Sequence, residues 1–213
     1  MSIRDFTANV ISASKVVPDG NFKDSKASGV WDINEALDLI KGGNWPNAAN
    51  INPAAFVDNL FQCHLFTGTG SGTSTIANGI DLINNDGLVW IKSRTGTSGE
   101  SHFLVDTKRG GSSVLQSNST AAATNFIGNP NFLSNGFSGT SNINDAQDYV
   151  SWTFRKQPKF FDVVTYTGNG NANRTVSHNL NATVGAIFIK CTSHTGNWSV
   201  WHRGVTSPNS SWW

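Results

Sequence analysis

The chain has 213 residues, 14% of them charged, and a formal net charge of +1. This length accommodates one or two domains with a hydrophobic core. The weak charge argues against nucleic acid or an acidic membrane surface as a partner, since either would require a concentrated basic patch. With 21 glycines, 8 tryptophans and only two glutamates, the composition predicts an all-β protein with short strands and polar loops.

The N-terminal region, residues 1–53, is predicted to contain a polar arm, one short helix and a linker. Asp32 is suited to cap the helix, with Glu35 at capping-box spacing and apolar residues at helical period behind it. The glycine pair at 42–43 ends this pattern. We therefore expect a helix over about 32–41. So short a helix is only marginally stable in water by itself, so it must pack against another surface.

Neither a secretory signal nor a membrane span is expected. The first residues carry charges throughout and lack the apolar core of a signal peptide. No apolar run in the chain approaches the roughly 18 residues of a transmembrane helix.

Residues 54–156 are predicted to form a β-sandwich. Turn signals recur at the 8–12-residue spacing typical of that architecture. A strongly apolar strand centred on V-W-I is followed, across a glycine-containing loop, by a second strand, so we expect a hairpin over residues 88–106. The expected strands fall within residues 61–67, 88–92, 102–106, 114–116, 131–138 and 149–154.

The opening of this unit occurs twice, at an offset of 100 residues. F-Q-C-H-L-F-T-G-T-G returns as F-D-V-V-T-Y-T-G-N-G, and after a two-residue slip G-L-V-W-I-K answers G-A-I-F-I-K. The match is predicted to close with K-R-G against H-R-G. A domain-sized repeat indicates tandem β-sandwich units rather than a solenoid. The paired segments begin at Phe61 and Phe161, Gly87 and Gly185, and Lys108 and His202.

The second unit, residues 157–213, is predicted to be incomplete. The first unit needs residues 111–155 to finish, whereas only nine residues follow Gly204. A half sandwich exposes unpaired strand edges and an apolar face, which soluble proteins avoid. Three explanations stay open: the sequence is shorter than the gene product, which we favour; other subunits complete the unit; or the remnant is a smaller fold.

Several segments resemble a repeated β-sandwich domain of bacteriophage tail-fibre and receptor-binding virion proteins, including those of marine and cyanobacterial phages. The resemblance is carried by G-L-V-W-I-K-S-R-T-G-T, H-F-L-V-D-T-K-R-G, F-L-S-N-G-F-S, D-Y-V-S-W-T-F-R-K and F-F-D-V-V-T-Y-T-G-N-G, in that order, and covers about residues 29–204. G-V-W-D-I-N-E-A with its trailing N-W-P is similar to an element that precedes such repeats in phage tail proteins. The resemblance implies a concanavalin A-like or laminin-G-like sandwich without catalytic residues.

The same resemblance implies a place in the virion, with the protein made in the host cytoplasm. Residues 1–53 would bind tail or adaptor proteins of the particle, and the chain would assemble as a homo-oligomer, expected to be a trimer. A host surface glycan is a possible partner of the β units. We expect neither nucleic acid nor membrane insertion.

No residue pattern predicts catalysis, a cofactor or a metal. A glycosidase needs two facing carboxylates, but Glu35 and Glu100 are poorly placed. N-N-D-G with a preceding aspartate has the oxygen ligands that calcium prefers, yet it is also an ordinary turn. The five histidines show no ligand spacing, and the two cysteines, at non-equivalent points of the repeat, predict separate thiols. The residues considered for catalysis are Asp106, Asp145 and Asp148, and those considered for calcium are Asp81, Asn84, Asn85 and Asp86. The histidines are His64, His102, His178, His194 and His202, and the cysteines are Cys63 and Cys191.

Tryptophan is the surplus residue type. Trp90 and Phe188 share a strand position in the two copies and are expected in the core. The unfinished unit contains four more tryptophans, Trp198, Trp201, Trp212 and Trp213. They are expected at an interface or in a core, with glycan stacking as the alternative. The favoured function is a structural virion protein for assembly and attachment. The alternatives are a lectin-like carbohydrate-binding module and, more weakly, a polysaccharide depolymerase. The sequence assigns no ligand-binding residue.

Overall fold

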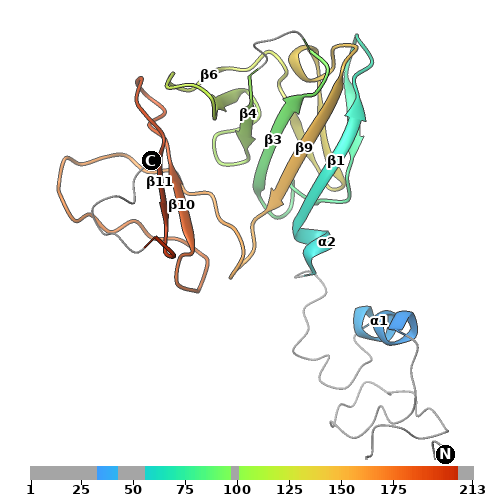
Figure 1. The fold of residues 1–213 in the computed structure, drawn as a ribbon, viewed down its shortest axis with the longest axis horizontal. Coiled ribbons are helices and arrows are strands. Elements are labelled where there is room, and N and C mark those ends of the chain that lie inside the picture. Colours follow the sequence, from blue (N-terminus) through green and yellow to red (C-terminus); the bar gives the residue numbers. More distant parts are fainter. Residues whose placement is uncertain (1–32, 43–55, 97–100, 206–213) are drawn as a thin grey trace, which may run out of the picture. The chain divides into compact units, whose positions relative to one another are not determined.

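The computed structural model describes residues 33–42, 56–96 and 101–205, and Figure 1 shows their helices and strands. The chain divides into two units, Met1–Phe56 and Val57–Trp213. In the first unit, helix α1 (Ile33–Lys41) confirms the predicted helix, and Ile33 is 80% exposed on its apolar stripe. The predicted cap Asp32, the arm and the linker lie outside the described residues.

The second unit contains an all-β sandwich, as predicted from composition and turn spacing. A six-stranded antiparallel sheet has the order β1-β9-β3-β4-β5-β6, and a three-stranded sheet has the order β2-β8-β7. A short helix, α2 (Val57–Leu60), leads into the first strand. The strands are β1 (Phe61–Thr67), β2 (Ser74–Ala77), β3 (Gly87–Ser93), β4 (Phe103–Asp106), β5 (Ser113–Gln116), β6 (Thr124–Asn125), β7 (Asn131–Leu133), β8 (Gly136–Gly139) and β9 (Asp148–Arg155).

The hydrophobic core lies between these two sheets. It joins apolar side chains of the six-stranded sheet, such as Val89 and Tyr149, to Ile76 and Phe137 of the three-stranded sheet. Phe66 of β1 stacks on Tyr149, with ring centroids 5.2 Å apart, and meets Phe137 edge-on. Burial of apolar surface on both sheets is the main stabilising contribution to such a sandwich.

The predicted strands of the sandwich form close to their expected bounds, and β3 pairs with β4 as the expected hairpin. Two short strands, β2 and β6, are not among the expected ones, and residues 131–138 divide into β7 and β8, which pair with each other around residues 134–135. β2 and β6 take their backbone partners from β8 and β5, and their own sequences do not reveal this pairing.

Strand β9 lies between β1 and β3, although it is the last strand of the sandwich in sequence (Figure 1). It pairs antiparallel with both neighbours, and Trp152 stands opposite Cys63 on one side and Trp90 on the other. Trp90 therefore lies on the outer face of the sheet, half-buried against Trp152, and the prediction that it belongs to the core is wrong. Because β3 is apolar on both faces, its neighbours decide which side chains point inward: Val89 and Ile91 are 0% exposed.

The second copy of the repeat forms a hairpin of β10 (Ala186–Ile189) and β11 (Ser199–His202). Its register reproduces that of β3 and β4. Ala186 opposite His202 corresponds to Leu88 opposite Asp106, and Phe188 opposite Val200 corresponds to Trp90 opposite Leu104. The predicted match of K-R-G with H-R-G is therefore wrong by two residues, since His202 occupies the place of Asp106.

Phe161–Thr167, the sequence counterpart of β1, forms no strand beyond a single bridge between Gln157 and Phe161. In the first copy, β1 has β9 as its partner throughout its length. Among the described residues no strand lies beside Phe161–Thr167 as β9 lies beside β1, so the same kind of sequence forms no ladder there.

The loop of the second hairpin contacts the sandwich beside β5. The indole Nε1 of Trp198 donates to the carbonyl of Gln116 at 3.0 Å, and the amide of Gly196 donates to the carbonyl of Thr120 at 2.9 Å. The amide of Ala123 donates in turn to the carbonyl of Thr192 at 3.0 Å. These hydrogen bonds give Trp198 an interface role within the chain, in agreement with its prediction.

Candidate functional site

A polar recess opens between the glycine-rich loop that follows β1 and the loop that precedes β9. Its volume is about 380 Å³, and it is lined by residues 70–73 on one side and by Thr140, Ser141, Asn144 and Asp145 on the other. The hydroxyl groups, backbone amides and one carboxylate of this lining suit hydrogen bonding to a polar ligand. The recess is the first candidate for a binding site.

Asn144 holds the glycine-rich loop in place. Its side chain is 1% exposed, and its Oδ1 accepts hydrogen bonds from the amide of Thr69 at 2.8 Å and from the hydroxyl of Thr69 at 3.1 Å. Its Nδ2 donates to the carbonyls of Ser71 at 3.0 Å and Gly72 at 3.2 Å. One buried amide side chain therefore holds three residues that line or flank the recess, Thr69, Ser71 and Gly72.

Glycine is required where this loop meets the opposite wall. A Cβ on Gly68 would lie 2.0 Å from the carbonyl oxygen of Asp145, which no side chain can tolerate. Gly70 adopts a φ of 80°, in the left-handed region that favours glycine. The repeated T-G-x-G motif is thus explained by close backbone packing, and the second copy, around Gly168, meets no such wall, since a Cβ there would have nothing within 4 Å.

The outer face of the six-stranded sheet carries an aromatic group, which we define as Trp90, Trp152 and His102. The two indoles meet edge-on with centroids 5.6 Å apart, and Nε1 of Trp90 donates to Nδ1 of His102 at 3.1 Å. Desolvation, with a smaller contribution from Lys92, lowers the pKa of His102 below its usual range. A neutral imidazole keeps Nδ1 available as the acceptor for the indole. Half-buried indoles on an open sheet face offer a second candidate contact surface.

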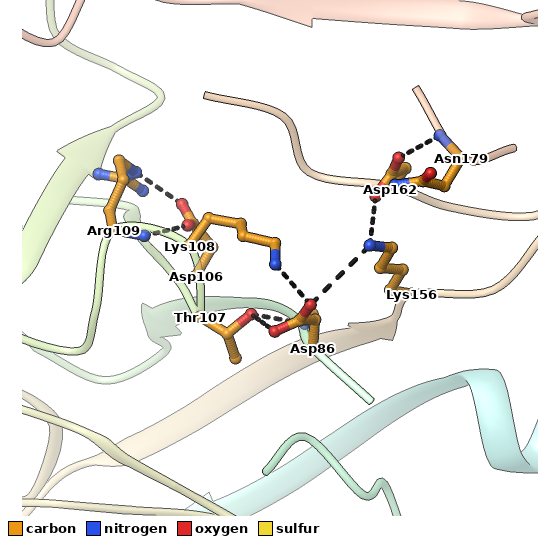
Figure 2. A network of polar contacts seen from close by, with 9 residues as sticks. Asp86, Asp106, Thr107, Lys108, Arg109, Lys156, Asp162 and Asn179 are labelled. Atoms are coloured by element: carbon orange, nitrogen blue, oxygen red, sulfur yellow. Dashed lines mark hydrogen bonds and ion pairs between the residues drawn. The ribbon is translucent and has the colours of Figure 1, made fainter. Parts of the chain in front are cut away.

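A charged network ties the start of the second copy to the sandwich (Figure 2). The carboxylate of Asp86 forms an ion pair with Nζ of Lys108 at 2.7 Å and a longer one with Nζ of Lys156 at 3.9 Å. Nζ of Lys156 also lies 3.5 Å from the carboxylate of Asp162. The hydrogen bond from Lys108 is the largest influence holding the pKa of Asp86 below its usual range, and Asp86 raises the pKa of Lys108. The amide of Asn179 donates to Asp162 at 2.7 Å. The network is structural, since each group already has a partner.

Two of the three aspartates weighed for catalysis, Asp106 and Asp148, lie at opposite ends of β3. Asp106 stands beside Leu88 at the start of β3, whereas Asp148 lies beside Arg94 just after its end. Six residues of extended strand separate these ends by roughly 20 Å, well above the spacing of about 5–10 Å that glycoside hydrolysis requires. Asp106 is 3% exposed and paired with Arg109, and Asp148 accepts from the hydroxyl of Thr67 at 2.7 Å.

The carboxylate oxygens that would bind calcium at the N-N-D-G turn already take part in hydrogen bonds and ion pairs. The carboxylate of Asp81 accepts from the amide groups of Asn84 and Asn85 at 2.9–3.2 Å, while Asp86 turns to Lys108 and Thr107. Among residues 33–42, 56–96 and 101–205, no three His, Cys, Asp or Glu side chains form a group suited to a metal ion. Over the same residues, no helix is both long and apolar enough to span a membrane.

Cys191 is predicted to be the more reactive of the two free thiols, Cys63 and Cys191. Hydrogen bonds from the side chain and amide of Ser193, followed by the amide of His194, lower the pKa of Cys191 to about 7. Because the thiolate is the nucleophile, alkylation of Cys191 by iodoacetamide should reach half its maximal rate near that pH. Ser193→Ala should shift the profile to higher pH, as followed by peptide mass spectrometry. An unchanged profile in this variant would contradict the assigned cause.

Sequence reasoning did not find Asn144, because its partners lie more than 70 residues away along the chain. The glycine-rich loop was the closest indication in the sequence. It predicted an irregular turn but did not reveal which residues the turn contacts. Nor did it find the outer aromatic group, which depends on β9 lying beside β3. Trp212, Trp213 and Glu100 lie outside the described residues.

The fold and these surfaces define an all-β sandwich protein with a second, partial copy of its central hairpin. Within that class, the chain belongs to the family described as a domain of unknown function, DUF7483, whose family model matches residues 57–212. The match includes both the sandwich and the second hairpin. No curated protein and no solved structure matches the chain.

Proposed function

We propose that this protein is a structural component of a bacteriophage particle, a tail fibre or related adhesion appendage that acts in assembly and host attachment. One observation carries the proposal beyond the resemblance of its motifs. The hairpin β10–β11 repeats β3–β4 pair for pair, as expected of a protein built from serial β modules. Such modules present loops along an appendage and work by shape and contact rather than turnover.

In this proposal the regions of the chain have separate tasks. Residues 1–53 bind other virion proteins of the tail or an adaptor, and the chain assembles as a homotrimer. The β units project outward and present the polar recess. A structural role is supported by the way the polar side chains are used: Asn144 and Asp106 each hold a turn in place.

A lectin-like carbohydrate-binding module is the second candidate function. The outer aromatic group favours it, because half-buried indoles can stack on sugar rings. The polar recess adds hydroxyl, amide and carboxylate groups suited to sugar hydroxyls.

The experiment that tests the first proposal is mass spectrometry of purified particles, followed by electron microscopy with antibodies raised against residues 57–205. We expect the chain in stoichiometric amounts in the particle, with the label on the tail. Absence from purified particles would contradict the proposal. Binding of the isolated chain to host polysaccharide, lost in Trp152→Ala but kept in Trp198→Ala, would favour the lectin-like module in its place.

A further inference from the structure

The second hairpin has an open edge at β10. Among the described residues, β10 pairs with β11 alone, whereas β3, its counterpart, lies between β4 and β9. Since the two hairpins share one register, the open edge of β10 is the edge to which β9 is bound in the first copy.

The backbone of β10 is oriented to accept a strand at this edge. The amide of Arg203 donates to the carbonyl of Gly185 at 3.0 Å, and the equivalent bond from Thr107 to Gly87 has the same length. In an antiparallel ladder, alternate residues direct both peptide groups to the same neighbour. The N–H and C=O of Ala186 and Phe188 therefore point away from β11, toward the open edge.

The side chains of β10 lack the cover that their counterparts have. Phe188 is 68% exposed, while Trp90 at the same position is packed against Trp152 of β9. The prediction that Phe188 belongs to the core is thus wrong for the chain as it stands. Ile187 and Ile189 are half-buried, although their counterparts in β3 are 0% exposed. An added strand would bury apolar surface on both faces of β10.

Little at this edge discourages strand pairing. Proteins commonly protect an edge strand with an inward charge, a proline or a bulge, but the residues of β10 are A-I-F-I. The charge of Lys190, which directly follows β10, is directed to the carbonyls of Thr120 and Cys191, each at 3.1 Å, whereas the charge of Arg203 lies beside Gly185, which precedes β10. The edge is therefore apolar, extended and unobstructed by its own sequence.

We infer that the β10 edge accepts an antiparallel strand with the chemistry of β9, supplied from outside residues 56–96 and 101–205. The first copy defines that chemistry. Trp152 and Phe154 of β9 face the side occupied by Trp90, whereas Ser151 and Thr153 face the core and are 0% exposed. The incoming strand thus alternates aromatic with small hydroxyl residues, and its central aromatic side chain contacts Phe188. Strand addition of this kind draws affinity from backbone hydrogen bonds and specificity from alternate side chains. The inference does not depend on the proposed virion role.

The test supplies such a strand to the full chain. D-Y-V-S-W-T-F-R-K, the sequence of residues 148–156, is appended after Trp213 through a flexible glycine–serine linker, which raises its effective concentration to the millimolar range. We expect amide hydrogen exchange, measured by NMR, to slow by about tenfold or more at Ala186 and Phe188 and at the tryptophan of the appended strand. The matched control carries proline in place of that tryptophan, which removes the central N–H donor, and should show no added protection.

Two variants of the hairpin separate strand addition from a general effect on folding. Phe188→Pro removes the N–H that faces the open edge, whereas Val200→Pro makes the same change on β11, opposite Phe188, where the N–H faces away from β10. Protection of the appended strand should fall by about tenfold in the first variant and stay within about twofold in the second. Equal protection with the proline-containing strand would overturn the inference. So would a concentration-dependent dimer of the unmodified chain that Phe188→Pro abolishes, because the occupant would then be a second copy of β10.

Discussion

Replacing Asp106 by alanine is expected to lower the free energy of unfolding by about 4 kcal/mol. Its carboxylate is nearly fully buried and accepts from Nε of Arg109 at 2.6 Å and from the amide of Arg109 at 2.9 Å. The guanidinium also donates to the carbonyls of Leu104 at 3.1 Å and Ser113 at 3.3 Å. Removing the carboxylate leaves the largely buried guanidinium of Arg109 with neutral acceptors only. Removing one partner of a buried ion pair is strongly destabilising because the remaining charge is not compensated.

Asp86→Ala is the matched control, since Asp86 forms its ion pair from the turn that leads into β3. Its carboxylate and the ammonium of Lys108 are each more than one-third exposed, so solvent screens the pair and its removal should cost at most about 1 kcal/mol. Urea unfolding of both variants, with an unchanged slope against urea concentration, measures the difference. A loss in Asp106→Ala no greater than that in Asp86→Ala would show that the buried pair is not a major stabilising contact.

Replacing Asn144 by alanine is expected to lower the free energy of unfolding by about 2 kcal/mol and to release the glycine-rich loop. The change removes one side chain that bonds the amide of Thr69 and the carbonyls of Ser71 and Gly72. Those partners lie near solvent and can be rehydrated, so the expected loss is smaller than at Asp106. Amide exchange should accelerate more over residues 69–72, which open locally, than at Val105 in the core of the sandwich, where exchange should rise only by the loss of global stability.

A conservative variant tests the geometry of this contact. Asn144→Asp keeps the oxygen that accepts from Thr69 but loses the Nδ2 donor to Ser71 and Gly72. We expect it to retain the protection of the Thr69 amide while residues 71 and 72 exchange faster. If both variants left the loop unchanged, the recess would be held by its backbone contacts alone, including the bond from Gly70 to the carbonyl of Asn144.

The two copies of the repeat differ in how two of their turns are held. Asp106 anchors the turn after β4 in the first copy, and its place in the second copy is taken by His202, which is exposed. The glycine-rich loop of the first copy is held by Asn144, whereas the loop at Gly168 lacks an opposing wall. The second difference arises because the wall opposite Gly68, formed by Asn144 and Asp145, belongs to a segment of the first copy that has no counterpart among residues 157–205.

Local pattern was sufficient for several elements. The 3.6-residue period and the paired glycines placed α1, and alternating or continuous apolar runs between turn signals placed β1, β3, β4 and β9 within one or two residues. The hairpin β3–β4 also followed, since neighbouring strands joined by a short loop usually pair. These features depend on contacts between residues close in sequence.

The sequence by itself determined the all-β class, the helix, most strands of the sandwich and the existence of a repeat, because each is written in composition or local periodicity. Only the tertiary structure decided the rest. It placed β9 beside β3, and so turned Trp90 outward, because a strand that is apolar on both faces does not encode which face meets the core. It joined Asn144 to a loop some 70 residues away, and it left β10 with an open edge. Pairing between distant strands depends on which partner is present, and no local pattern specifies that.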